Sequence, residues 1–326
     1  MKALVTGAGA VLGQGIIKSL RQSALACEVV AADPNPLSSG LYWADRAYRV
    51  PLADDAAFGD RIHEIIDRER PDAVFVGTDV ELTYFAEQRG TLEANFATQV
   101  IVSDLRVIAI ADDKLATARF FAQAGLAPPG SARQEDDDEI EALIDAVGFP
   151  LVVKPRVGAR SVGVSLVHNR QALADALAGR SGLVVQECVG TEDNEFTASV
   201  LVFDGVAQAS IVMRRDLRDG NTYRAYTGAY ETLNRAVCGF GEALQPHGPA
   251  NFQFRVDRHG RPRVFEINAR FSGTTPMRAM AGFNEVEMCL RKLLLGEPVV
   301  QPAIREGVIL RFLDEMFVER PASTRC

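Results

Sequence analysis

The sequence is poor in the residues from which disulfide frameworks and zinc sites are built. Its 326 residues include five cysteines and four histidines, with no C-x-x-C pair and no two histidines at the spacing of metal ligands. No apolar run approaches the roughly 20 residues that cross a bilayer. Residues 1–5 lead directly into a glycine-rich turn, so no signal peptide is predicted. These absences predict a reduced, cytoplasmic protein without a membrane partner.

The acidic balance of the chain argues against a nucleic-acid partner. The formal net charge is −8 at pH 7, whereas phosphate backbones are bound by clustered Lys and Arg. A local basic pocket for a small anion stays open. The length predicts about two domains, and the composition, 47% hydrophobic and 24% charged, is typical of globular proteins.

The first third of the chain alternates short apolar runs with helical patterns. Such alternation predicts a doubly wound α/β domain, in which a parallel sheet has helices on both faces. The apolar runs are 2–6, 28–32, 73–76 and 99–102, and the helical stretches include 61–68 and 80–88.

Two turns that follow these strands have more than one interpretation. The first reads G-x-G-x-x-x-G from Gly7 to Gly13, with Leu12 where a dinucleotide fingerprint has its third glycine and Asp33 as the would-be ribose acid. This spacing argues against NAD and leaves either close helix–strand packing or another ligand contact. In the second turn, either Thr78 or Asp79 caps a helix, or Asp79 and Glu81 contact a small molecule at the carboxyl edge of the sheet.

The middle of the chain combines lysines with a glycine loop. Lys154 ends an apolar strand predicted at 149–155, and the loop 158–163 follows with Arg160 at its tip. Backbone N–H groups in such a loop bind anions, and a nearby lysine supplies a point charge to a phosphate. A helix is predicted to begin near Lys114 and to run to about residue 124.

Residues 250–270 are the most informative segment, a predicted β-hairpin with a His-Gly turn. Period-two alternation places polar side chains on one face and apolar side chains on the other. Oxygen ligands with one carboxylate suit Mg²⁺, and a neighbouring arginine can stabilise a transferring phosphoryl group; a solvated outer face is the alternative. The polar set is Gln253, Arg255, Glu266, Asn268 and Arg270, and the apolar set is Phe252, Phe254, Phe265 and Ile267.

These segments together resemble the ATP-grasp superfamily, and within it the carbamoyl-phosphate-synthase-like carboxylate–amine ligases. The resemblance rests on the order of Lys154, the loop 158–163, the strand end 186–189 and the segment 266–270. Each motif is common by itself, but their joint order is specific.

The resemblance implies a division of the chain into three parts. Residues 1–111 would form a Rossmann-like pre-ATP-grasp domain with a doubly wound parallel sheet. Residues 112–296 would form a two-lobed α+β ATP-grasp domain whose mobile lid covers about 115–187. Residues 297–326 would be a C-terminal extension.

The resemblance also implies cofactors and residue roles. ATP and Mg²⁺ are expected, with Mn²⁺ as a substitute for the metal. Many family members have a carboxylate where this chain has Gln253, which leaves a second metal ion open. The implied nucleotide contacts are Lys114, Lys154, Gly158, Arg160, Ser161, Gly163, Gln186, Glu187, Val189 and Glu195, the metal ligands Gln253, Glu266 and Asn268, and the catalytic residues Arg270 and Lys154.

The implied activity is an ADP-forming carbon–nitrogen ligase that activates a carboxylate as an acyl phosphate and joins it to an amine. A carbamate- or bicarbonate-phosphorylating enzyme, an NAD-binding oxidoreductase and a non-catalytic nucleotide-binding regulator are the alternatives. The arginine-rich stretch 213–224 either docks an anion or is a mobile surface loop, and residues 274–275 with the Asp79 turn are candidates to receive the amine. The run 307–313 either completes a sheet or forms a homodimer contact.

Overall fold

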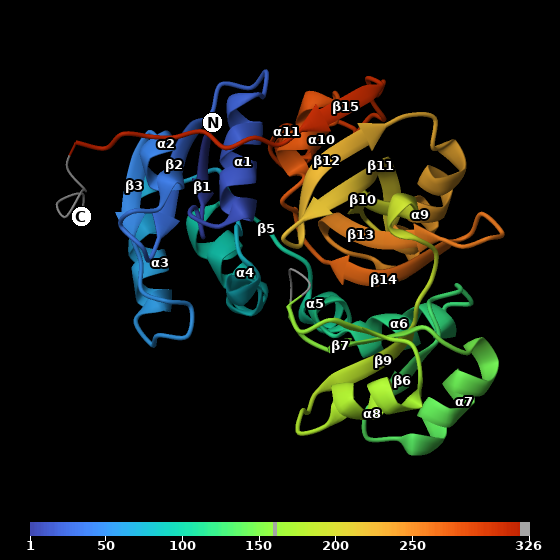
Figure 1. The fold of residues 1–326 in the computed structure, drawn as a ribbon. Coiled ribbons are helices and arrows are strands. Elements are labelled where there is room, and N and C mark those ends of the chain that lie inside the picture. The colour runs from blue at the N-terminus through green and yellow to red at the C-terminus, as the bar shows by residue number, and fades with distance from the viewer. Residues whose placement is uncertain (159–161, 320–326) are drawn as a thin grey trace.

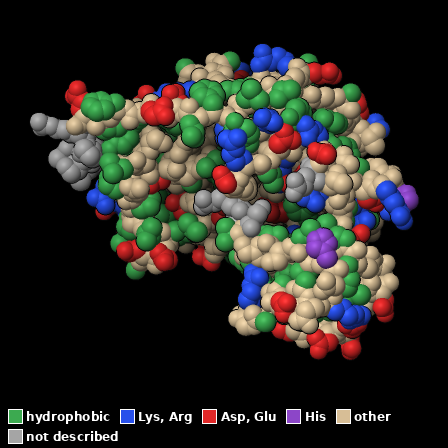
Figure 2. Space-filling model, in the orientation of Figure 1, with side chains coloured by type: hydrophobic (Ala, Val, Ile, Leu, Met, Phe, Trp, Pro, Cys, Tyr) green, Lys and Arg blue, Asp and Glu red, His purple; other side chains and the backbone are tan. Residues whose placement is uncertain are grey.

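The computed structural model describes residues 1–158 and 162–319. In this part of the chain the strands form three β-sheets, each with its own helices (Figure 1). Figure 2 shows a hollow in the surface where the unit at the bottom of the view, residues 131–187, meets the rest of the molecule. Within the described ranges, no helix combines the length and the apolar composition needed to cross a membrane.

The N-terminal domain is built on a five-stranded parallel sheet in the order β3-β2-β1-β4-β5. Its central strands are apolar and buried on both faces, because helices cover both sides. The predicted doubly wound sheet is confirmed, although the short, polar edge strand β3 was not foreseen. The elements are β1 (Lys2–Val5), α1 (Val11–Arg21), β2 (Glu28–Asp33), α2 (Ser39–Trp43), β3 (Arg46–Arg49), α3 (Phe58–Glu69), β4 (Ala73–Phe75), η1 (Asp79–Glu81), α4 (Leu82–Phe96) and β5 (Gln99–Ile101).

The glycine turn after β1 has a packing role. A Cβ atom on Gly13 would lie 2.3 Å from the carbonyl oxygen of Gly7, so α1 can approach the strand only at a glycine. Asp33 is buried and accepts hydrogen bonds from the Gly9 amide at 2.6 Å and the Ser38 hydroxyl at 2.6 Å. The carboxylate that would hold a ribose therefore holds the turn itself.

A helical linker leads into a smaller unit, which we call the lid. The lid is a four-stranded antiparallel sheet, in the order β6-β9-β7-β8, with two helices packed on it. The predicted helix from Lys114 is confirmed, and its first turn is capped by the side chain of Asp113. The elements are α5 (Leu105–Asp112), α6 (Lys114–Gln123), β6 (Ser131–Arg133), α7 (Asp137–Val147), β7 (Leu151–Pro155), β8 (Ser165–Val167), α8 (Arg170–Leu177) and β9 (Leu183–Glu187).

The central sheet has six antiparallel strands in the order β14-β13-β10-β11-β12-β15. Helices α5, α6 and α9 pack on one face, and α10 and α11 join the other face to the N-terminal domain. The last strand, β15, pairs with β12 and completes the sheet, one of its two predicted roles. The elements are η2 (Glu192–Asn194), β10 (Glu195–Phe203), β11 (Val206–Arg218), β12 (Asn221–Thr227), α9 (Glu231–Leu244), β13 (Gly248–Val256), β14 (Pro262–Asn268), α10 (Thr275–Met280), α11 (Glu285–Leu295) and β15 (Gly307–Leu310).

The arginine-rich stretch 213–224 is part of a β-hairpin, so its interpretation as a mobile surface loop is wrong. Strands β11 and β12 pair across it, and the chain reverses at Asp219 and Gly220, which have φ of 51° and 71°. Arginines stack on tyrosine rings along this hairpin: the half-buried Arg214 guanidinium lies 3.7 Å from the ring centroid of Tyr226. These contacts order side chains that the sequence alone would leave free.

One residue of the 250–270 hairpin lies on the opposite face from the one predicted. Consecutive residues of β13 pair with Glu266 and Val264, so the pairing skips Phe265. This β-bulge turns the Phe265 ring away from the core and toward a cavity that the ring lines. The rest of the apolar set is buried as expected, with Phe252 and Phe254 fully inside.

Candidate active site

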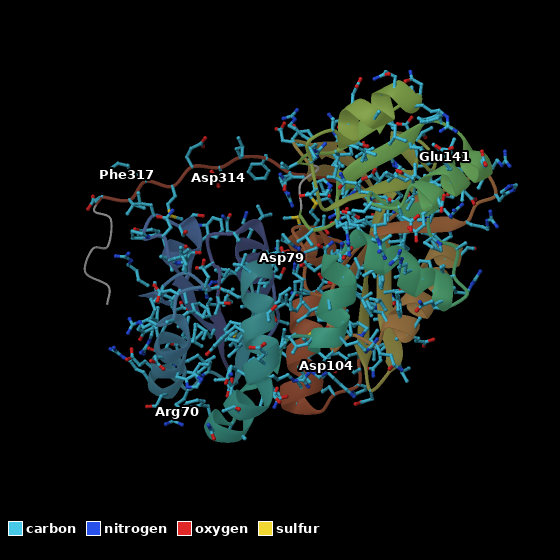
Figure 3. All side chains as sticks on the ribbon, turned by 90° about the horizontal axis from the view of Figure 1, so that it is seen from below. Arg70, Asp79, Asp104, Glu141, Asp314 and Phe317 are labelled. Carbon is cyan, nitrogen blue, oxygen red and sulfur yellow. The ribbon has the colours of Figure 1, made fainter. Side chains whose placement is uncertain are left out.

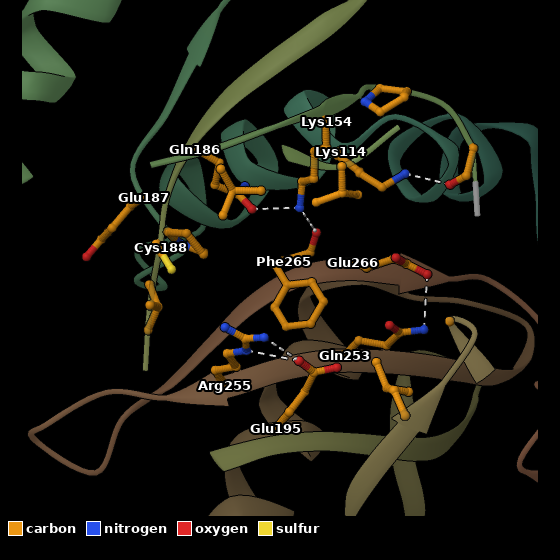
Figure 4. A pocket seen from close by; sticks show the side chains of 18 of the residues that line it. Lys114, Lys154, Gln186, Glu187, Cys188, Glu195, Gln253, Arg255, Phe265 and Glu266 are labelled. Carbon is orange, nitrogen blue, oxygen red and sulfur yellow. Dashed lines mark hydrogen bonds and ion pairs between the residues drawn. The ribbon is translucent and has the colours of Figure 1, made fainter. Parts of the chain in front are cut away.

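Most of the predicted site residues meet in one cavity between the lid and the central sheet (Figure 4). This first cavity has a volume of about 320 Å³. Strands β7 and β9 of the lid form one wall, and strands β10, β13 and β14 form the opposite wall. The predicted residues that line it are Lys114, Lys154, Gly158, Gln186, Glu187, Val189, Glu195, Gln253 and Glu266.

Lys154 lies at the inner end of this cavity, where strand β7 faces the central sheet. Its side chain is 6% exposed, and its Nζ donates to Gln186 Oε1 at 2.7 Å and to the Phe265 carbonyl at 3.4 Å. Burial lowers the pKa of Lys154 to about 8, although the nearby Glu266 carboxylate acts in the opposite direction. A charged ammonium at this position would therefore be stabilised by an approaching anion.

Lys114 reaches the same end of the cavity from the first turn of α6. Its Nζ donates to the Gly158 carbonyl at 2.6 Å, which ties the helix to the start of the glycine loop. Two lysines from separate segments thus converge on one region, as phosphate binding requires. Arg160 and Ser161 lie outside the described residues, and the Gly163 carbonyl accepts from Arg180 Nη2 at 2.9 Å instead of lining the first cavity.

The other end of the cavity is organised by two carboxylates. Glu187 Oε2 accepts from the Gly130 amide at 2.9 Å and from Arg263 Nη2 at 2.8 Å, which fixes β9 against the linker and β14. Glu195 is 5% exposed, and its two oxygens bind Arg215 Nη2 at 2.7 Å and Arg255 Nη2 at 2.9 Å. The resemblance to the ATP-grasp superfamily implies that Glu187 contacts adenine and Glu195 contacts ribose, and both contacts stay predictions.

The three predicted metal ligands lie together on the central sheet. Glu266 Oε1 accepts from Gln253 Nε2 at 3.0 Å and from Asn268 Nδ2 at 3.3 Å. The amide oxygens face arginines: Gln253 Oε1 accepts from Arg215 at 2.6 Å, and the Asn268 oxygen accepts from Arg270 at 2.8 Å. A carboxylate and two amides in mutual contact are the oxygen donors that Mg²⁺ accepts, once the amides rotate their oxygens inward. The set fits a magnesium site, and the described residues contain no cluster of three His, Cys, Asp or Glu side chains that could hold a metal ion.

A second cavity of about 400 Å³ adjoins the first. It lies between the central sheet and the glycine turn of the N-terminal domain, and Asn268 and Arg270 line it as well. The residues that line both cavities are Arg215, Gly220, Gln253 and Glu266.

Arg270 connects the second cavity to the N-terminal domain. Its Nε and Nη2 donate to the two carboxylate oxygens of Asp79, at 2.5 and 2.8 Å. Figure 3 shows Asp79 at the boundary between the N-terminal domain and the rest of the molecule. Neither Thr78 nor Asp79 makes a side-chain cap of η1 or α4, so the helix-capping interpretation is wrong. The second turn instead contributes its acid to the site.

Several lining residues were not singled out at the level of the sequence, among them Asn251, Arg215 and Arg311. Asn251 lies two residues before Gln253, so the same period-two alternation could have found it. Arg215 was hidden in the arginine-rich stretch, and no local signal separates it from its neighbours. Arg311 follows β15, and its Nη2 donates to the Gly273 carbonyl at the rim of the second cavity; only the pairing of β15 brings it there.

Comparison with known families agrees with this geometry. A RimK-like ATP-grasp domain matches residues 111–232, a model described as ATP-grasp in the biosynthetic pathway with Ter operon matches 182–316, and the PylC-like N-terminal domain matches 4–102. The two ATP-grasp matches together include both walls of the first cavity. Residues 111–316 therefore match ATP-grasp domains, and residues 4–102 match a PylC-like N-terminal domain.

Known relatives are carbamoyl phosphate synthase large chains. The chain is 24% identical to that of Thermomicrobium roseum in a match 337 residues long, and this match covers 94% of this chain and 30% of the relative. It is 25% identical to that of Myxococcus xanthus over 329 residues, covering 90% and 30%. The chain therefore spans about 30% of the length of these relatives.

Solved structures share the fold at low sequence identity. The biotin carboxylase domain of Hydrogenobacter thermophilus 2-oxoglutarate carboxylase has a TM-score of 0.71 at 18% identity, covering 94% of this chain and 73% of that one. Staphylococcus aureus N5-carboxyaminoimidazole synthetase, complexed with ADP, has a TM-score of 0.70 at 16% identity, covering 95% and 79%. The L-amino acid ligase of Bacillus licheniformis has a TM-score of 0.69 at 21% identity, covering 92% and 74%.

Proposed function

We propose that this protein is an ADP-forming ligase that phosphorylates a carboxylate with ATP and joins the resulting acyl phosphate to an amine. One observation carries the proposal. Gln253 and Glu266 line both cavities, so the candidate metal ligands lie between the lysine-lined first cavity and the second cavity, which Arg270 lines. This is the arrangement that transfer of a phosphoryl group between two bound molecules needs.

The first cavity would hold the nucleotide. Its phosphates would lie near Lys114 and Lys154, and its base near Glu187 and the backbone of Val189. Bound Mg²⁺, held by Gln253, Glu266 and Asn268, would screen the phosphate charge. Structural neighbours that were crystallised with ADP and with MgADP support this assignment.

The second cavity would hold the carboxylate. One carboxylate oxygen attacks the γ-phosphorus in line, the bond to the ADP oxygen breaks, and an acyl phosphate forms. Arg270 stabilises the charge on the transferring group, for which it must exchange part of its contact with Asp79. The amine nitrogen then attacks the acyl carbon and expels inorganic phosphate, which leaves an amide. The lid and the loop that begins at Gly158 would exclude water, because water would hydrolyse the acyl phosphate.

Phosphorylation of bicarbonate or carbamate is a second candidate. It is favoured by the carbamoyl phosphate synthase relatives and by a neighbour crystallised with bicarbonate. An NAD-dependent reaction is disfavoured, because Asp33 is committed to the Gly9 amide and the Ser38 hydroxyl.

ADP release from Mg·ATP tests these proposals. Purified protein is assayed with panels of carboxylates, bicarbonate and amines, and with Glu266→Ala as the blank. ADP that appears only with a carboxylate and an amine together supports the ligase, and ADP with bicarbonate alone supports the second candidate. NADH turnover without any dependence on ATP would overturn both.

A cytoplasmic location and a homodimer stay predictions. The Hydrogenobacter thermophilus neighbour was crystallised as a dimer. Light scattering of the purified chain at several concentrations measures its own state directly.

A further inference from the structure

A fully buried ion pair lies behind the second cavity and has no part in the mechanism above. Arg278 on α10 and Glu285 on α11 are both 0% exposed, and Arg278 Nη1 lies 2.9 Å from Glu285 Oε1. Glu285 also accepts hydrogen bonds from the hydroxyls of Ser199 and Thr275. Burying two charges is costly, so the pair is poorly explained by stability alone.

The second terminal nitrogen of the Arg278 guanidinium, Nη2, points toward the wall of the second cavity. Arg278 Nη2 donates to Asn251 Oδ1 and, at 3.3 Å, to Thr197 Oγ1. Thr197 Oγ1 in turn donates to the same Asn251 oxygen at 2.9 Å. Both Thr197 and Asn251 line the second cavity.

These contacts fix the orientation of the Asn251 amide. A guanidinium has donors only, so the amide atom that faces it must be the oxygen. The amide nitrogen, Nδ2, is left on the cavity side, and among the described residues it has no hydrogen-bond partner. Asn251 is 1% exposed, so only a molecule inside the cavity can satisfy its N–H groups.

We propose that Asn251, held by Arg278, donates a hydrogen bond to an oxygen of the acid substrate, and that this contact makes the second cavity select an oxyanion over an amine. Arg311, at the rim of the second cavity, supplies a further hydrogen-bond donor. Arg278 is a positioning residue, because it acts only through the amide. This inference rests on the proposed function, since it specifies which of the two substrates the cavity receives.

Substitution of Asn251 by Asp tests the donor. The change keeps size and keeps an oxygen facing Arg278, but it replaces the N–H groups with an oxygen that repels anions. Sodium [13C]acetate and [13C]bicarbonate are titrated separately by NMR at saturating MgADP, with ethylammonium as the opposite probe. We expect carboxylate affinity to fall about tenfold or more, while MgADP affinity changes less than about twofold. Asn169→Asp is the matched control: it adds the same charge at the N-cap of α8, where Asp caps as well as Asn.

A double-mutant cycle tests the positioning role. Arg278→Gln is combined with Glu285→Gln so that no unpaired charge is buried, and circular dichroism and MgADP binding report folding. We expect the pair to weaken carboxylate binding about fivefold, and Asn251→Ala, which removes the N–H groups without adding a charge, to cost less in that background than in the wild type because the amide is already unpinned. Fully additive effects would show that Arg278 does not act through Asn251.

The outcomes separate this inference from the proposed function. If the wild type fails to bind MgADP, the nucleotide site itself is wrong. If MgADP binds but neither carboxylate does, if ethylammonium binds instead, or if Asn251→Asp binds carboxylates as the wild type does, the inference is overturned while the nucleotide site stands.

Discussion

The N-terminal sheet and the central sheet use buried acids in opposite ways. In the N-terminal domain, Asp33 holds a turn and Glu69 binds Lys2 Nζ at 3.1 Å, so these carboxylates stabilise the fold. On the central sheet, the buried Glu195 and the half-buried Glu266 line the first cavity. Burial alone therefore does not distinguish a structural acid from a functional one; the distinction lies in whether a cavity adjoins it.

The largest expected effect comes from making the same substitution in both regions. Glu266→Gln removes the only carboxylate of the candidate metal set, and we expect substrate-dependent ADP release to fall on the order of 10²–10³-fold. Folding should be nearly unchanged, because an amide can still contact Gln253 and Asn268. Steady-state kinetics measures the loss, and a thermal melt measures stability.

Glu69→Gln is the matched change in the N-terminal domain. The Glu69 side chain is 0% exposed and binds Lys2, Arg46 and the Tyr48 hydroxyl. We expect the free energy of unfolding to fall by about 1–3 kcal/mol and the activity to stay within about twofold. If Glu69→Gln abolished activity in the folded protein, or Glu266→Gln left it intact, the contrast between the two sheets would be wrong.

Most elements were predictable from local pattern, because apolar runs and glycine turns mark strands and helix starts, whereas the short, polar edge strand β3 was not. The bulge at Phe265 was not, since a skipped residue becomes visible only when the partner strand is known. Period-two alternation placed Gln253 and Glu266 on one face correctly. Lys154 lies on the lid, and the family resemblance, not the residue spacing, predicted that it shares a site with Gln253 and Glu266. Arg311 enters the site through the pairing of β15, a long-range contact that no local pattern carries.

A smaller effect should follow from Glu81, the buried acid at the edge of the N-terminal sheet. Burial raises the pKa of Glu81 to about 7, against the hydrogen bond that Thr6 Oγ1 donates at 2.5 Å. Between about pH 4.5 and 7 the folded state therefore binds more protons than the unfolded state, so stability falls as pH rises through this window. We expect Glu81→Gln to remove this dependence and to be more stable than wild type at pH 8 by about 2 kcal/mol.

Urea unfolding at pH 5 and pH 8 measures this difference for both proteins. Glu69→Gln serves again as the comparison, because it alters a buried acid of the same domain that is paired with cations. A wild-type stability that is flat over this range would show that Glu81 is already ionised in the folded state.

The last effect concerns Lys154, the buried cation of the central site. With a pKa of about 8, its ammonium is lost from the free protein as pH rises above that value, whereas bound phosphates would restore it. Nucleotide affinity should therefore fall with increasing pH, by at most about tenfold per pH unit between pH 8 and 10. Calorimetry of MgADP binding in buffers of different ionisation enthalpy should show proton uptake in the same range. Lys154→Arg keeps a permanent charge and should remove both the pH dependence and the proton uptake. Affinity that is independent of pH in the wild type, without proton uptake, would show that nucleotide binding does not change the protonation of Lys154.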